Sequence, residues 1–142
     1  MAAAVRVGTR ARTGSATALT PRYSPDYSKI LYLSYVDGNP RIYVYDVGTG
    51  RQRLVTQSRN PTFAPRWSPD GKWIAGFLQN KEDGTFPGIA VYSLERETFQ
   101  RLSPFGMDPV WLSDGRRLLF NHEGRIYLAD ESTRRRLKSA FD

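Results

Sequence analysis

Cysteine is absent from the 142 residues, which excludes disulfides, thiolate zinc sites and a cysteine nucleophile. Histidine occurs once, as His122, so a histidine pair for a metal ion is missing too. No apolar run approaches the about 18 residues of a membrane-spanning helix. The Gly-x-Ser-x-Gly motif and the glycine-rich phosphate loop are also absent, and no serine stands in a nucleophile motif, although composition alone leaves a Ser-His-Asp triad open. The sequence therefore predicts no catalysis of its own, no metal and no cofactor.

The positive charge gathers toward the two ends of the chain. Lys and Arg number 21 against 14 Asp and Glu, which gives a net charge of +7. Residues 1–22 contain four arginines and no acid, and the last residues include Arg134, Arg135, Arg136 and Lys138. A positive surface attracts acidic partners, but a nucleic-acid reader needs basic and aromatic residues interleaved on one face within a docking motif. We therefore prefer a solvated basic surface, and a basic nucleic-acid or membrane-surface binder stays an alternative.

The first twenty residues have little apolar content. They are rich in Ala, Thr and Arg, and their sizeable apolar side chains are those of Val5, Val7 and Leu19. A secretory signal needs a continuous apolar core, which is not visible here, so the sequence as read predicts a cytoplasmic protein. We interpret residues 1–20 as a flexible basic leader. An organellar transit peptide and a short outer strand around residues 5–7 are the alternatives.

Three segments of the chain share a turn motif at a constant spacing. Their aspartates, Asp26, Asp70 and Asp114, are 44 residues apart in both intervals. The segments read Pro21-Arg22-Tyr23-Ser24-Pro25-Asp26, Pro65-Arg66-Trp67-Ser68-Pro69-Asp70-Gly71 and Pro109-Val110-Trp111-Leu112-Ser113-Asp114-Gly115. A period of about 40 to 45 residues is typical of propeller blades.

Each repeat has the pattern of short antiparallel strands. The runs 30–35, 73–78 and 117–121 are β-branched, aromatic or Leu-rich, are too short for helices, and each follows an aspartate-centred turn. Two further signals recur in the same register, at 41–46, 88–93 and 125–130 and at 52–54, 100–102 and 135–137. The sequence thus predicts an all-β fold, a partial β-propeller of about three four-stranded blades, at roughly 21–60, 61–106 and 107–142.

These residues resemble the TolB-type, WD-repeat-like β-propeller family. In that family a Pro-x-Trp-Ser-Pro-Asp-Gly segment opens the blade and an Ile-Tyr-Val-x-Asp segment forms its third strand, and the resemblance covers residues 21–142. It implies the fold and leaves the function at the level of a class. Such propellers occur as protein-binding modules, as periplasmic translocation components, and as domains attached to peptidases or kinases.

Two repeats depart from the family pattern. Tyr27 stands where the family has Gly, which costs on the order of 1 kcal/mol if that position is left-handed. Leu112-Ser113 replaces Ser-Pro in the third repeat, which also has a shorter insert. Each change weakens one turn and leaves the repeat recognisable.

The recurring polar and aromatic residues have structural interpretations. One aspartate per blade caps its turn, because calcium needs six to eight oxygens around one centre and the three carboxylates are expected far apart. Tyr23, Trp67 and Trp111 hold equivalent first-strand positions and are expected to pack between blades, with a ligand-stacking platform as the alternative. His122 lies in the run Asn121-His122-Glu123-Gly124 and is expected as an exposed turn residue.

Arg22 and Arg66 are the candidate partner-binding residues. They precede the first-strand aromatics, on what should be the innermost strands, which border the central channel of a propeller. A guanidinium there pairs well with carboxylates of an acidic peptide. The alternative is an alkyl stem packed along the blade with a solvated head group. The third repeat has Val110 at this position, so a complete basic ring is not expected.

The sequence predicts a non-catalytic protein-binding or scaffold module. The alternative from another class is a propeller accessory to a hydrolase or kinase domain that lies outside this chain. The expected partner is another protein or peptide. Because three blades cannot close a ring, a homodimer that completes six blades, or missing blades from a longer chain, is expected as well. The chain would be periplasmic if it is a fragment of a TolB-like protein.

Overall fold

The computed structural model describes residues 18–36, 39–55, 62–80 and 82–130, and all regular elements in these ranges are β-strands. Their bounds are β1 Ala18–Tyr23, β2 Lys29–Val36, β3 Asn39–Asp46, β4 Gln52–Leu54, β5 Thr62–Trp67, β6 Trp73–Leu78, β7 Gly88–Ser93, β8 Thr98–Ser103, β9 Met107–Trp111, β10 Leu118–His122 and β11 Arg125–Ala129. The predicted leader lies outside the described residues up to residue 17, and residues 18–20 belong to β1.

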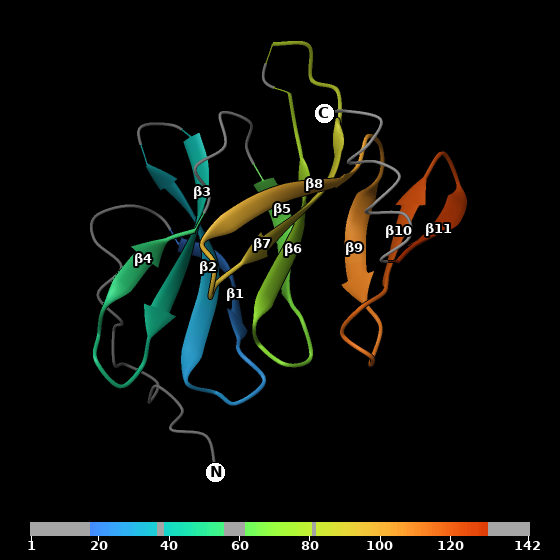
Figure 1. Ribbon diagram of the computed structural model, residues 1–142. Helices are drawn as coiled ribbons and strands as arrows, with labels where there is room; N and C mark the ends of the chain where they lie inside the picture. The colour runs from blue at the N-terminus through green and yellow to red at the C-terminus, as the bar shows by residue number, and fades with distance from the viewer. Residues whose placement is uncertain (1–17, 37–38, 56–61, 81, 131–142) are drawn as a thin grey trace.

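The strands form three antiparallel sheets that follow chain order. Their orders are β1-β2-β3-β4, β5-β6-β7-β8 and β9-β10-β11. Figure 1 shows them side by side, from the first sheet, which runs from blue to green, to the orange and red third sheet. β5 contacts β1, and β9 contacts β5, so the first strands of successive sheets are neighbours. The all-β partial propeller is confirmed; the fourth strand predicted at 135–137 lies outside the described residues.

The aspartate-centred turns connect the first two strands of each sheet. In the first sheet Ser24 Oγ donates a hydrogen bond to Asp26 Oδ1 at 2.7 Å and accepts one from the Lys29 amide at 2.9 Å. Ser68 and Asp70 repeat the first contact at 2.6 Å. Tyr27 has a φ of 61°, where the later repeats have glycines at 72° and 67°. The predicted left-handed position is therefore confirmed, and Tyr27 carries the strain of a side chain there.

A second left-handed position recurs within the first strand of each sheet, and the sequence analysis did not predict it. Thr20, Ala64 and Asp108 have φ values of 51°, 47° and 51°, and each directly precedes the repeat proline. The strand pairing shifts at the same point, between Leu19 and Arg22 in β1 and between Phe63 and Arg66 in β5. An extra residue bends the strand and changes the direction of the residues that follow. Each first strand thus carries a bulge.

The apolar core lies between neighbouring sheets. The first cluster unites Leu31, Leu33, Ile42 and Val44 of the first sheet and Val55 after it with Ile74 and Tyr92 of the second sheet. The second cluster unites the second sheet with the third in the same way, through Ala75, Ile89, Val91, Leu102, Leu118, Phe120 and Ala129. Burial of apolar surface is therefore shared across each seam, which we define as the contact between two consecutive sheets.

A tryptophan joins the sheets at each seam. Trp67 Nε1 donates a hydrogen bond to the carbonyl of Arg22 at 3.1 Å, and Trp111 Nε1 donates one to the carbonyl of Arg66 at 3.2 Å. Both indoles are half-buried and pack against the two clusters, so they lie between blades as predicted without being fully enclosed. The neighbouring Pro65 and Pro109 are fully buried. The same anchor therefore holds both seams.

We expect Trp67→Phe to lower the free energy of unfolding by about 1 kcal/mol, because it removes the hydrogen bond to Arg22 and keeps most of the ring. Trp67→Ala also empties the packed site, and we expect it to cost about 3 kcal/mol. Urea unfolding at one fixed protein concentration measures both values. A cost below about 1 kcal/mol for Trp67→Ala would contradict the anchoring role.

Candidate functional site

The two candidate arginines lie on neighbouring first strands. Arg22 is exposed on β1 and Arg66 is half-buried on β5, and the indole of Trp67, the residue after Arg66, bonds to the Arg22 carbonyl. The two residues are therefore close along one seam. Neither guanidinium makes an ion pair within the part of the chain that the structure describes. Val110 holds the third position and is 53% exposed.

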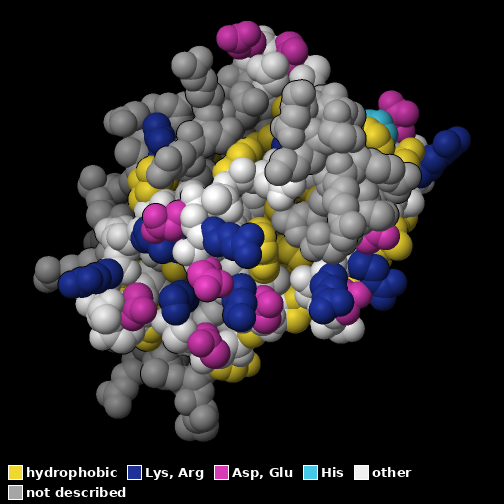
Figure 2. Space-filling view, viewed as in Figure 1, with side chains coloured by type: hydrophobic (Ala, Val, Ile, Leu, Met, Phe, Trp, Pro, Cys, Tyr) yellow, Lys and Arg dark blue, Asp and Glu magenta, His cyan; other side chains and the backbone are white. Residues whose placement is uncertain are grey.

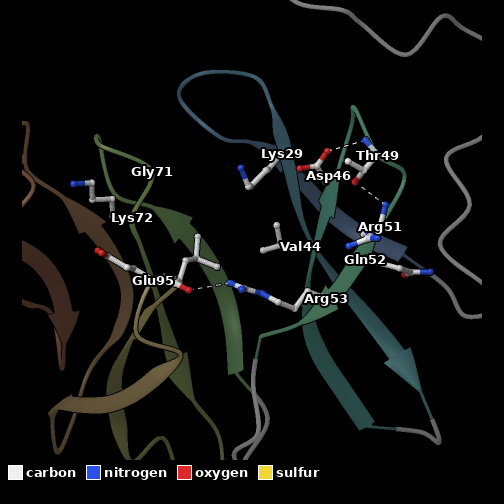
Figure 3. A pocket seen from close by; sticks show the side chains of 11 residues that line it. Lys29, Val44, Asp46, Thr49, Arg51, Gln52, Arg53, Gly71, Lys72 and Glu95 are labelled. Atoms are coloured by element: carbon white, nitrogen blue, oxygen red, sulfur yellow. Dashed lines mark hydrogen bonds between the residues drawn. The ribbon is translucent and has the colours of Figure 1, made fainter.

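A cleft of about 820 Å³ lies at the outer part of the first seam. Figure 3 shows Lys29 and Asp46 on the wall formed by the first sheet, Lys72 and Glu95 on the opposite wall, and Val44 between them. The hairpin turn between β3 and β4 closes one side through Thr49 and Arg51. A smaller depression of about 310 Å³, lined by Ser24, Pro25, Asp26, Lys29, Pro69, Asp70 and Gly71, continues it.

Arg53 crosses this cleft from one sheet to the other (Figure 3). Its Nη2 donates a hydrogen bond to the Leu94 carbonyl at 3.2 Å, and its Nη1 lies 3.3 Å from Glu97 Oε1. Both side chains of this ion pair are largely exposed, so the pair itself adds little to stability. Together the two contacts hold the Arg53 guanidinium across the cleft, against the second sheet.

The charges around the cleft are unequal. Its lining contains four basic side chains, those of Lys29, Arg51, Arg53 and Lys72, and two acidic ones, those of Asp46 and Glu95. A hydrogen bond from the Thr49 backbone amide, 2.9 Å long, lowers the pKa of Asp46, so this carboxylate stays negatively charged while it caps its own turn. Figure 2 shows basic and acidic side chains close together on the lower part of this face. Because Glu97 compensates the charge of Arg53, a small excess of basic side chains remains in the cleft, beside the apolar Val44 and Leu94.

Sequence reasoning did not find the cleft, although one signal for it exists. Lys29 begins the second strand of the first sheet, and Trp73 holds the equivalent place in the second sheet. Trp73 packs against the second core cluster. The second seam thus has an aromatic ring at the position where the first seam has the side chain of Lys29. A comparison of the repeats at this position would have indicated that the two seams differ.

The aspartates of the turns act as caps. Hydrogen bonds from the Ser28 amide and hydroxyl and from Ser24 lower the pKa of Asp26 to about 2. The Arg116 amide, together with the Arg117 side chain, lowers the pKa of Asp114 to about 2 as well. Within residues 18–36, 39–55, 62–80 and 82–130, no group of three His, Asp or Glu side chains could hold a metal ion. The carboxylates thus serve the turns they stand in.

His122 is not the exposed turn residue that we predicted. It is the last residue of β10, is half-buried, and its ring centroid lies 4.6 Å from that of Phe105. The turn itself consists of Glu123 and Gly124, whose φ values of 48° and 74° place them in the left-handed region. The two-residue turn begins one position later than expected, which leaves His122 paired with Arg125 in the sheet.

The comparison with known families agrees with this architecture. The TolB beta propeller domain family matches residues 8–133, nearly the whole chain. The chain belongs to this family. A relative, the Tol-Pal system protein TolB 1 of Novosphingobium aromaticivorans, is 73% identical over 40 residues, which are 28% of this chain and 9% of the relative.

Several solved structures share this fold. TolB from Acinetobacter baumannii superposes with a TM-score of 0.67 at 27% identity, over 84% of this chain and 31% of that one. The propeller domain of the trilobed protease from Pyrococcus furiosus gives a TM-score of 0.66 at 22% identity, over 84% of this chain and 40% of the other. An oligogalacturonate lyase gives 0.65 at 24%, over 85% and 37%. This TolB-family chain thus spans about a third of the solved TolB.

Among the described residues of this TolB-family chain, no helix is long and apolar enough to cross a membrane.

We expect the stability of this TolB-family segment to fall in acid. A carboxyl group whose pKa is lowered by folding from 3.8 to about 2 stabilises the fold above pH 4, and its contribution is lost as the pH falls toward 2. Titration of the carboxyl carbons by NMR should give midpoints near 2 for Asp26 and Asp114. Asp26→Asn and Asp114→Asn should flatten the fall in urea midpoint over this window. NMR midpoints at the unfolded value would contradict the capping geometry.

Proposed function

We propose that this chain is a protein-binding segment of a TolB-type propeller and has no catalysis of its own. The observation that carries the proposal is a pair of guanidinium groups, on adjacent first strands of a TolB-family fold, that have no ion-pair partner in the part of the chain that the structure describes. Arg22 and Arg66 use their backbone carbonyls to hold the seam, and their side chains make no ion pair among the described residues. Charged groups held in this way are available to a carboxylate of another molecule.

The partner that fits this surface is an acidic segment of a protein. Carboxylates of such a segment would pair with Arg22 and Arg66 and follow the first seam outward to the cleft, where Lys29 and Lys72 supply further positive charge. Val44 and Leu94 offer an apolar floor for a side chain between the carboxylates. The contact is open to solvent, so salt weakens it over a Debye length of about 8 Å at physiological ionic strength.

The name of the relative indicates which proteins to test. TolB 1 of Novosphingobium aromaticivorans is a Tol-Pal system protein, so we propose that this chain binds a protein of a Tol-Pal system and works in the periplasm. A second copy of the chain, or further blades, would be a separate partner. Such a partner would cover the outer faces of the first and third sheets, not the surface that holds Arg22 and Arg66.

We expect the double substitution Arg22→Glu and Arg66→Glu to weaken binding to such a partner by about tenfold or more, because two attractive charge contacts become repulsive. Surface plasmon resonance against immobilised Tol-Pal proteins of Novosphingobium aromaticivorans measures the effect. Arg116→Glu combined with Arg125→Glu, the same change of charge at two exposed residues away from the first seam, is the matched control. Equal binding by the double variant and wild type would refute the arginine site, and binding to a DNA duplex that falls steeply with salt would favour the nucleic-acid alternative.

We expect no turnover by the purified chain. The described residues contain no metal-binding cluster, and His122, the one histidine, packs against Phe105 and Tyr127. Assays with peptidase, esterase and phosphatase substrates should give background rates, and His122→Ala should leave them unchanged. A rate above background that is lost in His122→Ala would overturn the non-catalytic proposal and leave the fold untouched.

A further inference from the structure

The first two sheets differ at the position that begins their second strands. Lys29 and Trp73 both stand three residues after the turn aspartate of their repeat. Two residues further on, Leu31 and Ala75 are 0% exposed and belong to the core clusters of the first and the second seam. Alternate side chains of a strand lie on the same face, so Lys29 faces the first seam and Trp73 faces the second.

A ring therefore occupies the second seam at the place where the first seam has a lysine. Trp73 is half-buried and packs against the second core cluster. Lys29 is half-buried as well, but its unbranched stem is narrower than an indole, and it lines the cleft of about 820 Å³. Small-molecule sites typically have volumes of about 300 to 1,000 Å³. The first seam thus has the space for a ligand that contains a ring.

The middle of the cleft is apolar. Val44, on β3, is 5% exposed and belongs to the first core cluster, and Leu94, which follows β7, packs against the same cluster. Gly71 contributes only backbone to the wall of the second sheet. An aromatic ring buries a large apolar area and has few rotatable bonds to immobilise, so it suits this cleft better than a flexible chain does.

A basic group reaches over this apolar surface. Figure 3 shows the Lys29 side chain extending from the first sheet toward the second, with Val44 between it and Arg53. The Lys29 ammonium donates a hydrogen bond to Ser28 Oγ at 3.3 Å and makes no ion pair among the described residues. Asp46, on the same wall, is bonded to the backbone of its own turn. A ligand carboxylate can therefore accept a hydrogen bond from this ammonium while an apolar body rests on Val44.

We propose that the cleft of the first seam binds a small aromatic carboxylate. Its ring packs on Val44 and Leu94, at the place that Trp73 fills in the second seam. Its carboxylate accepts a hydrogen bond from the Lys29 ammonium. Arg53, which crosses the cleft, offers its guanidinium to the face of the ring. The ring and the negative charge are thus both needed for binding.

Isothermal titration calorimetry of the full chain with phenylpropionate tests the site. We expect saturable binding to one site per chain. Phenylpropylamine, which carries the same ring on a cation, and propionate, which lacks the ring, should each bind at least about tenfold more weakly, because each loses one of the two contacts. A chain that binds no phenylpropionate would overturn the proposal, and equal binding of phenylpropylamine would overturn the carboxylate assignment.

Lys29→Gln separates this site from a general effect of positive charge. We expect it to weaken phenylpropionate binding by about fivefold to tenfold, because it removes the charged donor. Lys72→Gln is the matched control, since Lys72 lies on the opposite wall and Figure 3 shows its end pointing away from Val44. It should change the affinity by less than about twofold. Equal affinities for Lys29→Gln and wild type, or an equal loss in Lys72→Gln, would overturn the assignment of Lys29.

Lys29→Trp tests whether the ligand takes the place of a ring. Its indole should fill the first seam as Trp73 fills the second, which should abolish phenylpropionate binding and raise the urea midpoint. A folded variant that binds with wild-type affinity would overturn the placement of the ligand.

This inference goes beyond the proposed binding of an acidic protein segment, because neither Arg22 nor Arg66 lines the cleft. Arg22→Ala combined with Arg66→Ala should therefore weaken binding of the partner protein and leave the affinity for phenylpropionate unchanged. Loss of phenylpropionate binding in this double variant would overturn the placement at Lys29. A wild-type chain that binds phenylpropionate and no acidic partner would overturn the proposed function alone.

Discussion

The structure depends on the contact between consecutive sheets, because no sheet can bury its own apolar face. Ile42 and Val44 need the second sheet, and Ile89 and Val91 need the third. The tryptophan bonds to the Arg22 and Arg66 carbonyls fix the distance and angle at which this burial occurs. The strand order, the turns and the bulges of each sheet all serve to present its apolar face to the next sheet. A repeat array of this kind is stabilised mainly by its nearest-neighbour contacts.

The local signals of the sequence predicted the fold well. Asp26, Asp70 and Asp114 are spaced 44 residues apart, and a strand pattern follows each turn. Both signals can be read along the sequence without knowledge of the tertiary structure. The left-handed position of Tyr27 was predictable because glycines stand at the same place in the other repeats. Repetition thus supplied the comparison that a single sequence otherwise lacks.

Other features depend on contacts that no local pattern encodes. Thr20, Ala64 and Asp108 have the left-handed backbone that usually favours glycine, and residue type alone gives no sign of it. Strain of this kind persists only because the surrounding strands hold it in place. The cleft at the first seam arises from side chains of two sheets, and His122 was misplaced by one residue because hairpin turns are set by pairing register.

The anchor at each seam is a hydrogen bond to the main chain. The residue that accepts it therefore holds the sheets together with its carbonyl, while its side chain takes no part in the bond. The carbonyl of residue 22 or 66 belongs to the main chain, so the bond from the neighbouring tryptophan does not depend on which side chain that residue bears. Substitutions at these positions can therefore change the chemistry displayed by the first strands while the architecture stays intact. A propeller built in this way can acquire new recognition surfaces by single amino-acid changes, at little cost to its fold.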